Sequence, residues 1–291
     1  MLKLDNEAKK VGLLFNTQKP QAIEMGRRLW RWGKENGIEF LLPPHEALAS
    51  ALPGVSDADW RETSSFAVVL GGDGTFLRAA RYTFGSNVPL YGINLGRLGF
   101  LAIGSPGSAE SDIKDILDGN FTLQRRSLIK GIVSRGGRAV HELHALNDLV
   151  ISKGDLARVV DLEVKVGNEV LSLFLADGLI LSTPTGSTAY ALSAGGPIVP
   201  PHVPCVIMAP ICAHTLYARP VILGENDEIT VISKGEERNI LLTQDGQLGY
   251  ELLPNDTLKV GLDDKNFIRT IQRNGRSYYD LWREKLSWGV N

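Results

Sequence analysis

A glycine-rich stretch that directly follows an apolar run constrains the fold of this chain most strongly. Residues 66–70, Phe-Ala-Val-Val-Leu, are apolar throughout, which is typical of a strand buried on both faces of a parallel sheet. The stretch Gly-Gly-Asp-Gly-Thr follows at 71–75, and we expect Thr75 to cap a helix that begins at 76–80. A strand, a glycine turn and a helix N-terminus in this order present backbone N–H groups to phosphate.

The acid within this stretch, Asp73, needs its own explanation, because a carboxylate beside a bound anion is repelled. A functional Asp73 would accept a proton or face a metal ion. The alternative is a tight glycine turn that carries a solvated acid. The stretch lacks the lysine and hydroxyl of the Walker A motif, and it lacks the Gly-x-Gly-x-x-Gly pattern of dinucleotide-binding turns.

Composition narrows the class of protein. With 291 residues, of which 43% are hydrophobic and 22% charged, the chain suits one large or two medium globular domains. A net charge of −2 argues against a nucleic-acid-binding surface. No apolar run reaches the ~18 residues of a membrane span, and the first residues lack the apolar core of a signal peptide. We therefore expect a cytosolic protein that binds neither nucleic acid nor membranes.

Strands and helices alternate over residues 1–120, which predicts an α/β domain with a parallel, Rossmann-like sheet. The expected strands are 11–16, 38–42, 66–70 and 88–94. Helices are expected at 20–36, at 45–52 and after residue 75, with a polar connection at 53–64. Ligands of open parallel sheets bind beyond the carboxyl ends of the strands, where residues 71–75 fall.

The pattern changes at about residue 121, where apolar and polar residues begin to alternate as in antiparallel strands. The pairs Gly136-Gly137 and Gly167-Asn168 are hairpin signals between such runs. We therefore expect a mostly antiparallel, all-β domain resembling a β-sandwich at 121–266. The aromatic and helix-like tail at 267–291 is expected to pack back on the first domain.

A second block, from Asp177 to Val199, contains a hydroxyl-rich loop after an apolar run. Residues 179–181 predict a strand, and the hydroxyls that follow it belong to Thr183, Thr185, Ser187 and Thr188. Such a loop offers hydroxyls and backbone N–H groups to phosphates or riboses, and Tyr190 offers a ring for stacking. The alternative is a Ser/Thr-rich surface loop.

Taken alone, the loop at 71–75 resembles the phosphate loops of NAD kinases, of lipid kinases of the diacylglycerol kinase type and of 6-phosphofructokinases. The block 177–199 resembles the long signature of NAD kinases and selects that family. Three further segments match the family in the expected order: 96–101, Asn147-Asp148 and 243–247. The resemblance implies an enzyme of two domains that phosphorylates NAD with ATP to give NADP.

The resemblance also implies a role for each matching position. Asp73 would be the general base towards the 2′-hydroxyl of the adenosine ribose of NAD. The residues that would meet phosphate are Gly71, Gly72, Gly74 and Thr75, and Arg158 would reach a further phosphate. The positions that would contact the dinucleotide are Phe100, Asn147, Asp148, Asp177, Thr188, Ala189, Tyr190, Ala191, Leu192, Ser193 and Gln247.

The chemistry of phosphoryl transfer fits these assignments. Transfer to a hydroxyl needs a proton acceptor, neutralisation of the phosphate charge, and alignment. Asp73 would accept the proton, and the N–H groups at 71–75 would act with the Mg²⁺ that accompanies ATP to neutralise charge. Closure of the two domains on the dinucleotide would align the reactants. We assign no protein ligand to a metal, because the H-x-x-H pair of His141 and His144 lies on a predicted strand and therefore faces opposite sides.

Two other functions stay open at this point. A lipid kinase would need an apolar lipid entrance or a basic membrane patch. A dinucleotide sensor without catalysis would need a misplaced Asp73. The resemblance further implies a homodimer or homotetramer assembled through the β domain. Two positions depart from the family: Leu175, where many members carry a basic or polar residue, and Ala191, where Ser is common.

Overall fold

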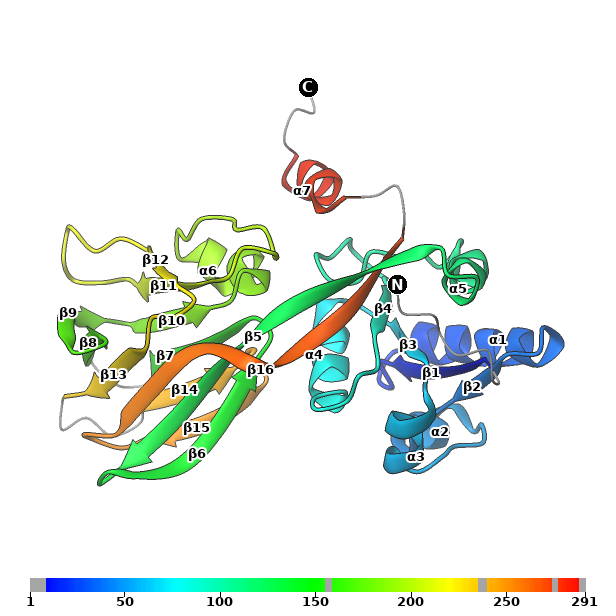
Figure 1. The fold of residues 1–291 in the computed structure, drawn as a ribbon, viewed down its shortest axis with the longest axis horizontal. Coiled ribbons are helices and arrows are strands. Elements are labelled where there is room, and N and C mark those ends of the chain that lie inside the picture. The colour runs from blue at the N-terminus through cyan, green and yellow to red at the C-terminus, as the bar shows by residue number, and fades with distance from the viewer. Residues whose placement is uncertain (1–8, 155–158, 235–239, 274–276, 288–291) are drawn as a thin grey trace. The chain divides into compact units, whose positions relative to one another are not determined.

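Residues 9–154, 159–234, 240–273 and 277–287 are described in a computed structural model of the chain. The chain divides into two units, Met1–Arg125 together with Ile268–Asn291, and Arg126–Phe267. β5 (Phe121–Arg135) and β16 (Thr257–Arg273) contribute residues to both units and pair with each other (Figure 1). Arg158, one of the expected phosphate contacts, lies outside the described residues.

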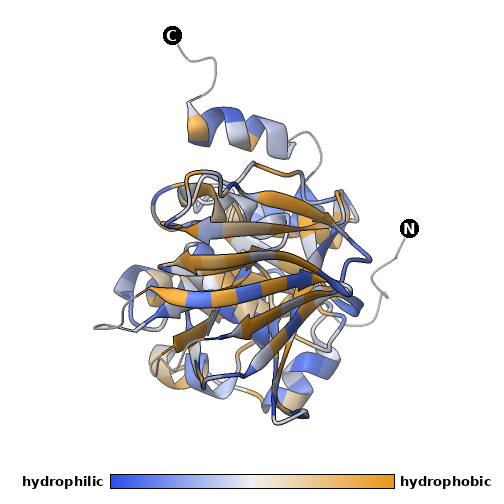
Figure 2. Ribbon diagram, turned by 90° about the vertical axis from the view of Figure 1, so that its left-hand side faces the viewer, coloured by the Kyte–Doolittle hydropathy of each residue, from blue (hydrophilic) through white to orange (hydrophobic). Residues whose placement is uncertain are grey.

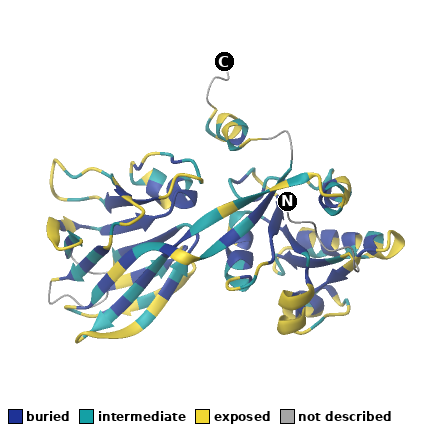
Figure 3. Cartoon of the chain, viewed as in Figure 1, coloured by how far each residue is buried: buried dark blue, intermediate teal, exposed yellow. Residues whose placement is uncertain are grey.

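A parallel sheet forms the centre of the first unit. Its strands lie in the order β2 (Glu39–Leu41), β1 (Lys10–Phe15), β3 (Phe66–Leu70) and β4 (Leu90–Ile93), and the end of β16 pairs with β4. β3 is a central strand, paired with β1 on one side and with β4 on the other, and every one of its residues is buried (Figure 3). The expected parallel sheet with an apolar central strand is confirmed.

Helices complete the first unit. Their bounds are α1 (Pro20–Glu35), α2 (Pro44–Ser50), α3 (Asp57–Thr63), α4 (Asp73–Tyr82), α5 (Ala109–Leu117) and α7 (Tyr278–Leu286). Pro20 stands at the first position of α1, where its missing N–H is harmless, and Ala22, Met25 and Leu29 bury one helical face. The end of α1 near residue 36 agrees with the expectation from the sequence.

The prediction of a polar connection without secondary structure at 53–64 is wrong, because α3 occupies most of this segment. The helix is short and buries only Trp60, so its sequence shows no apolar period. Its N-terminus is nevertheless well capped, since the Ser56 side chain accepts a hydrogen bond from the Asp59 N–H. Trp60 is fully buried and donates its ring N–H to the Leu41 carbonyl at 2.9 Å, which ties α3 to β2.

The helix after the glycine turn also begins earlier than the sequence predicts. Gly72, not Thr75, is the N-cap of α4, and its carbonyl accepts the N–H groups of Thr75 and Phe76. Glycine lacks a side chain that could reveal it as a cap, which explains the error. The consequence is that Asp73 stands in the first turn of α4 rather than in the loop before it.

The second unit is built from two antiparallel sheets. One continues from β16 through β13 (Ile229–Ser233), β8 (Val160–Val166) and β9 (Glu169–Ala176), with β5 and β6 (Arg138–Ala145) paired beside it. The other has the order β12 (Val221–Gly224), β11 (Cys205–Ile211), β10 (Gly178–Ser182), β7 (Asp148–Lys153), β14 (Ile240–Gln244) and β15 (Leu248–Leu252). The expected antiparallel β domain is confirmed.

A large apolar cluster joins the two sheets of the second unit. It takes Leu149 and Leu179 from one sheet and Val164 and Val231 from the other, and all four are buried. Along β8 and β13, buried and less buried residues alternate because successive side chains point to opposite faces, and hydrophobic and hydrophilic segments alternate along strands of this unit in Figure 2. A 3₁₀ turn, η1 (Thr185–Thr188), and a single helical turn, α6 (Tyr190–Ser193), follow the buried strand β10.

The C-terminal tail belongs to the first unit. Ile271, near the end of β16, is buried in the core beneath the parallel sheet. The Arg273 guanidinium bonds the carboxylates of Asp112 and Asp115 on α5, at 2.9 Å in the case of Asp115. None of the described helices is both long and apolar enough to cross a membrane.

Candidate active site

The turn after β3 is shaped by two glycines with different constraints. A Cβ at Gly71 would lie 2.4 Å from the Thr75 hydroxyl oxygen, so any side chain there would clash. A Cβ at Gly72 would meet nothing within 4 Å, so the N-terminus of α4 is open above this residue. Gly74 is exposed and Thr75 is buried. The first N–H groups of a helix have no intrahelical partners, and the macrodipole favours an anion at this end.

The Asp73 carboxylate is held by a second glycine-rich segment. It accepts hydrogen bonds from the N–H groups of Phe100, Leu101 and Ala102 at 2.8, 3.0 and 3.2 Å. A Cβ at Gly99 would lie 2.1 Å from an Asp73 carboxylate oxygen, so only glycine allows this approach. An ionised carboxylate offers about four lone-pair positions. Three are used here, which leaves one acceptor position for another partner.

The segment that binds Asp73 is itself fixed within the first unit. The Asn94 side chain bonds the Gly96 N–H at 2.8 Å and the Arg97 carbonyl at 2.6 Å. At its far end, the Lys285 ammonium of α7 bonds the Leu98 carbonyl and lies 5.7 Å from the centre of the Phe100 ring. Phe100 is half-buried, so its ring is placed but remains accessible.

In the second unit, the pair Asn147-Asp148 lies in a turn that is hydrogen-bonded to the end of β10 and to the residue after it. The Asn147 carbonyl accepts the Thr183 N–H at 2.8 Å and the Ser182 hydroxyl at 3.1 Å. The Thr183 hydroxyl donates to the Leu146 carbonyl at 2.5 Å. Asp245, from the segment 243–247, also binds this turn by accepting the Asn147 N–H. The pair Asn147-Asp148, the block 177–199 and the segment 243–247 therefore meet at one place in this unit.

Asp148 is buried, with 4% of its surface exposed. Burial raises the pKa of its carboxyl group from 3.8 to about 7, and the neighbouring negative charge of Asp245 adds to the shift. Asp148 therefore holds its proton up to near neutral pH, so that it can both donate and accept a hydrogen bond. Asn147 is half-buried.

In the hydroxyl-rich loop, two of the hydroxyl groups bind main-chain groups of the protein. Thr183 and Ser187 are fully buried. The Ser187 hydroxyl bonds the Pro184 carbonyl at 2.7 Å and accepts the Val199 N–H at 3.0 Å. These two hydroxyls therefore form hydrogen bonds that stabilise the loop. Thr188, half-buried, bonds the Thr185 carbonyl at 3.3 Å.

The residues after this loop are divided between the core and the surface. Ala191 is fully buried against Val150, Ile180 and Ala209, so only its backbone remains for a ligand. Tyr190 is 46% exposed, which leaves its ring free to stack. Three further residues here were expected to contact the dinucleotide. Ser193 is exposed, and Ala189 and Leu192 are half-buried.

Asp177 and Gln247 complete the expected positions of the second unit. Asp177 forms a 2.6 Å ion pair with Lys153 of β7, and each side chain is about one-third exposed. Gln247 is exposed at the turn between β14 and β15. The sequence gives no sign of Lys153, because it lies outside every motif, and pairing between β7 and β10 brings it to Asp177.

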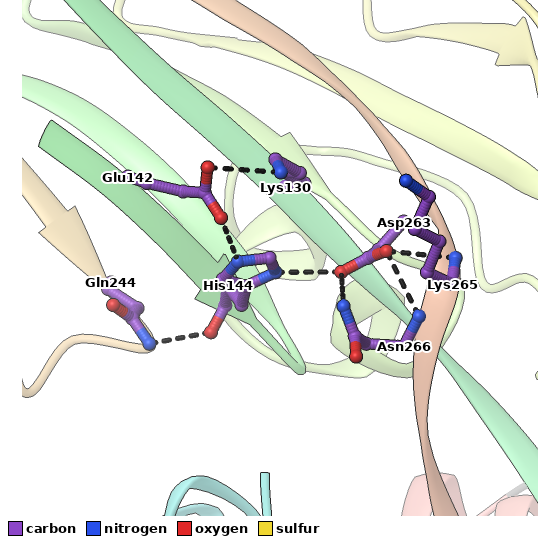
Figure 4. Close-up of polar contacts among 7 residues, drawn as sticks. All are labelled: Lys130, Glu142, His144, Gln244, Asp263, Lys265 and Asn266. Carbon is purple, nitrogen blue, oxygen red and sulfur yellow. Dashed lines mark hydrogen bonds and ion pairs between the residues drawn. The ribbon is translucent and has the colours of Figure 1, made fainter. Parts of the chain in front are cut away.

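A polar network beside this turn involves the second histidine of the H-x-x-H pair (Figure 4). The His144 ring bonds the carboxylates of Asp263 at 2.7 Å and Glu142 at 2.8 Å, and the Gln244 side chain donates to the His144 carbonyl at 2.6 Å. His141 instead stacks on Tyr250 with ring centres 4.2 Å apart. Within the described ranges, no group of three or more His, Cys, Asp or Glu side chains could hold a metal ion.

Comparison with known proteins follows the same division of the chain. A family model of the ATP-NAD kinase N-terminal domain matches residues 11–121, and one of the ATP-NAD kinase C-terminal domain matches residues 146–270. The NAD kinase of Geotalea daltonii is 36% identical over 283 residues, which cover 97% of this chain and 99% of that protein. The NAD kinase of Symbiobacterium thermophilum is 39% identical over 281 residues, with coverage of 96% and 99%.

Two solved structures share the fold. A yeast NADH kinase complexed with NADH has a TM-score of 0.89 at 24% identity, and covers 99% of this chain and 90% of that chain. An NAD kinase from Archaeoglobus fulgidus in complex with ATP has a TM-score of 0.75 at 23% identity, with coverage of 96% and 100%.

A parallel α/β unit with a glycine-lined helix N-terminus, joined to an antiparallel β unit, defines a nucleotide-binding enzyme of two domains. The two family models, and relatives that match over nearly their full length, identify the particular family. The chain belongs to the ATP-NAD kinase family.

Proposed function

We propose that this member of the NAD kinase family transfers the terminal phosphoryl group of ATP to the 2′-hydroxyl of the adenosine ribose of NAD. The observation that carries the proposal is the position of Asp73. It stands in the first turn of α4, among the glycines, and three backbone N–H groups fix the orientation of its carboxylate. A fixed carboxylate at a phosphate-binding helix N-terminus suits a general base that acts beside an incoming phosphoryl group.

In this reaction the hydroxyl oxygen attacks the terminal phosphorus atom, and the bond from that atom to the bridging oxygen of ATP breaks, which releases ADP. The hydroxyl proton passes to the fourth acceptor position of Asp73. A ribose hydroxyl is a weak acid, so the proton leaves as the new phosphorus–oxygen bond forms. The open N-terminus of α4 at Gly72 binds phosphate oxygens through its N–H groups.

The second unit would hold the dinucleotide. The half-buried Asn147 and the protonated Asp148 suit ribose hydroxyls and adenine, because each can both donate and accept hydrogen bonds. The exposed Tyr190 ring would pack on the dinucleotide, and the half-buried Phe100 is a further expected contact of the dinucleotide. Asp177, paired with Lys153, would face the nicotinamide side.

Mg²⁺ would enter the proposed reaction together with ATP. The described residues offer no group of three acidic or histidine ligands, whereas Mg²⁺ in kinases is held mainly by substrate phosphates, waters and one or two carboxylates. When bound, it supplies neutralisation of the charge on the transferring phosphoryl group. The N–H groups at the start of α4 act on the same charge.

A homo-oligomer assembled through the β unit is part of the proposal. On β9, Leu171, Leu173 and Leu175 are between 44% and 60% exposed, while Phe174 and Ala176 between and beside them are buried. β9 is the last strand of its sheet among the described strands. An apolar strand face at a sheet edge is a liability in a monomer and suits contact with a second copy. The cytosolic location stays a prediction.

The reaction is tested by incubating the purified chain with ATP, Mg²⁺ and NAD and measuring NADP with an NADP-specific dehydrogenase. We expect NADP to accumulate, and no transfer to diacylglycerol under the same conditions. Absence of NADP above background would overturn the proposal. Binding of NAD without turnover would favour the dinucleotide sensor.

Asp73→Asn tests the base. We expect kcat to fall by about 10²- to 10⁴-fold, the usual contribution of a general base, while NAD binding remains measurable. Asp57→Asn makes the same change at the first position of another helix, α3, and should leave kcat unchanged. Normal turnover by the Asp73 variant would show that another group accepts the proton.

A further inference from the structure

Asp245 opens the turn between β14 and β15, and the turn alone does not require a carboxylate there. Asp245 and Gly246 have φ values of 50° and 62°, and the Gln247 N–H donates to the Gln244 carbonyl at 3.0 Å. Positive φ at both central residues defines a type I′ hairpin turn, which favours Asn-Gly as much as Asp-Gly. Asparagine at 245 would therefore satisfy the backbone equally well.

The carboxylate instead binds a segment nearly a hundred residues earlier in the chain. It accepts the N–H groups of Asn147 at 2.7 Å, Leu146 at 3.3 Å and Asp148 at 3.4 Å. The Asp245 N–H returns a hydrogen bond to the Asp148 carbonyl at 2.9 Å. Asp245 is only 7% exposed, so these charge-assisted hydrogen bonds are formed largely away from water.

The opposite side of the same turn is held by the block after β10. Besides the bonds from Thr183 and Ser182, Gly186 approaches so closely that a Cβ there would lie 2.2 Å from the Asn147 carbonyl oxygen. The main chain at 146–148 is thus fixed from both sides. Among the described residues, neither Asn147 nor Asp148 has a side-chain hydrogen bond, so these two side chains remain available to a ligand.

The negative charge at 245 also has an electrostatic cost. It lies beside the buried carboxyl group of Asp148 and disfavours the ionised form of that group. A neutral residue would avoid this repulsion and keep the turn. The retained charge is explained by the three N–H groups that it binds.

We propose that Asp245 is a positioning residue for the phosphorylation of NAD, whose carboxylate fixes the main chain at 146–148 and thereby sets where Asn147 and Asp148 meet the dinucleotide. The inference rests on the proposed role of Asn147 and Asp148 as dinucleotide contacts. Asp245 itself acts through these residues and needs no contact with substrate.

The test is Asp245→Asn, which keeps the type I′ turn but places an amide where the carboxylate accepted N–H groups. We expect KM for NAD to rise about tenfold or more, because bonds from N–H groups to a charge are lost. KM for ATP and the thermal midpoint should change little. Asp227→Asn is the matched control, since Asp227 accepts one N–H, from Gly224 at 2.7 Å, in another turn of the same unit.

A double-mutant cycle with Asn147→Ala separates positioning from general destabilisation. In the Asn147→Ala background, Asp245→Asn should raise KM for NAD by a smaller factor than in the wild-type background, because only Asp148 is then left for Asp245 to position. An unchanged KM for NAD in the single Asp245 variant, equal rises in KM for NAD and ATP, or simple additivity with Asn147→Ala would overturn the inference.

Asp245→Ser provides the same readouts if the asparagine variant does not fold, because it removes the charge and leaves a smaller polar side chain. Failure of the proposed function is recognised separately, because the wild-type chain would then form no NADP. In that case calorimetric binding of NAD to wild type and to the Asp245 variants replaces KM. Equal affinities, or no binding at all, would overturn the inference.

Discussion

Asp73 in the first unit and Asp245 in the second share one structural device, a carboxylate that accepts N–H groups from three consecutive residues of another segment. The partners of Asp73 are 27 to 29 residues away in the sequence. Those of Asp245 are 97 to 99 residues away. Both acids lie in motifs that are recognisable in the sequence, but no local sequence pattern predicts which N–H groups they bind. Each acid therefore joins two motifs that look independent along the chain.

The raised pKa of Asp148 makes a prediction about stability and pH. The folded protein holds this proton up to about pH 7, whereas the unfolded chain loses it near 3.8. The folded state therefore binds more protons between these values, and the unfolding free energy falls by up to about 1.4 kcal/mol per pH unit as pH rises. Asp148→Asn removes this loss. The thermal midpoint of Asp148→Asn minus that of wild type should therefore increase between pH 5.5 and pH 8.

Thermal unfolding of both proteins at several pH values between 5 and 8 checks this expectation. The exposed acid Asp118, changed to Asn, is the matched control, and its difference from wild type should not vary in this way. A difference for Asp148→Asn that is constant with pH would mean that Asp148 is already ionised in the folded protein.

At the scale of elements, the segment 94–104 supports the turn that carries Asp73, the proposed general base. Gly99→Ala tests this, because its Cβ would lie 2.1 Å from the Asp73 carboxylate and must displace it or the segment. We expect kcat to fall at least about tenfold, since small misplacements of a catalytic group are costly. Gly96→Ala is the control, since the nearest atom to its Cβ is 3.9 Å away. Steady-state kinetics of the two variants distinguish them, and equal activities would contradict this view of the segment.

Elements also show where sequence patterns succeed and fail. The long amphipathic helix α1 and the buried strand β3 were predictable, because each carries its apolar residues at the spacing of its own geometry. α3 was missed because only Trp60 is buried along it. The start of α4 was misplaced because Gly72 caps it without a side chain.

At the scale of the whole molecule, the apolar face of β9 predicts self-association through the second unit. Leu173, 60% exposed, lies on this face. Leu173→Lys places a charge where a second copy would bury the side chain, and should shift the mass measured by light scattering towards the monomer. Leu48→Lys, at an 84% exposed position on α2, should leave the mass unchanged. A wild-type chain that is monomeric at micromolar concentration would contradict the expected assembly.

Contiguous residues were enough to predict the alternating α/β unit and the antiparallel β unit, and to single out the glycine turn at 71–75 and the block at 177–199. Periodicity and turn chemistry are local properties, so the sequence carries them directly. Only the tertiary structure decided that segment 99–102 orients Asp73, that the Thr183 and Ser187 hydroxyls stabilise the fold, and that Asp148 keeps its proton. Hydrogen bonding and desolvation depend on atoms that the fold brings together from distant parts of the chain, and a local sequence pattern does not show which residues become neighbours in space.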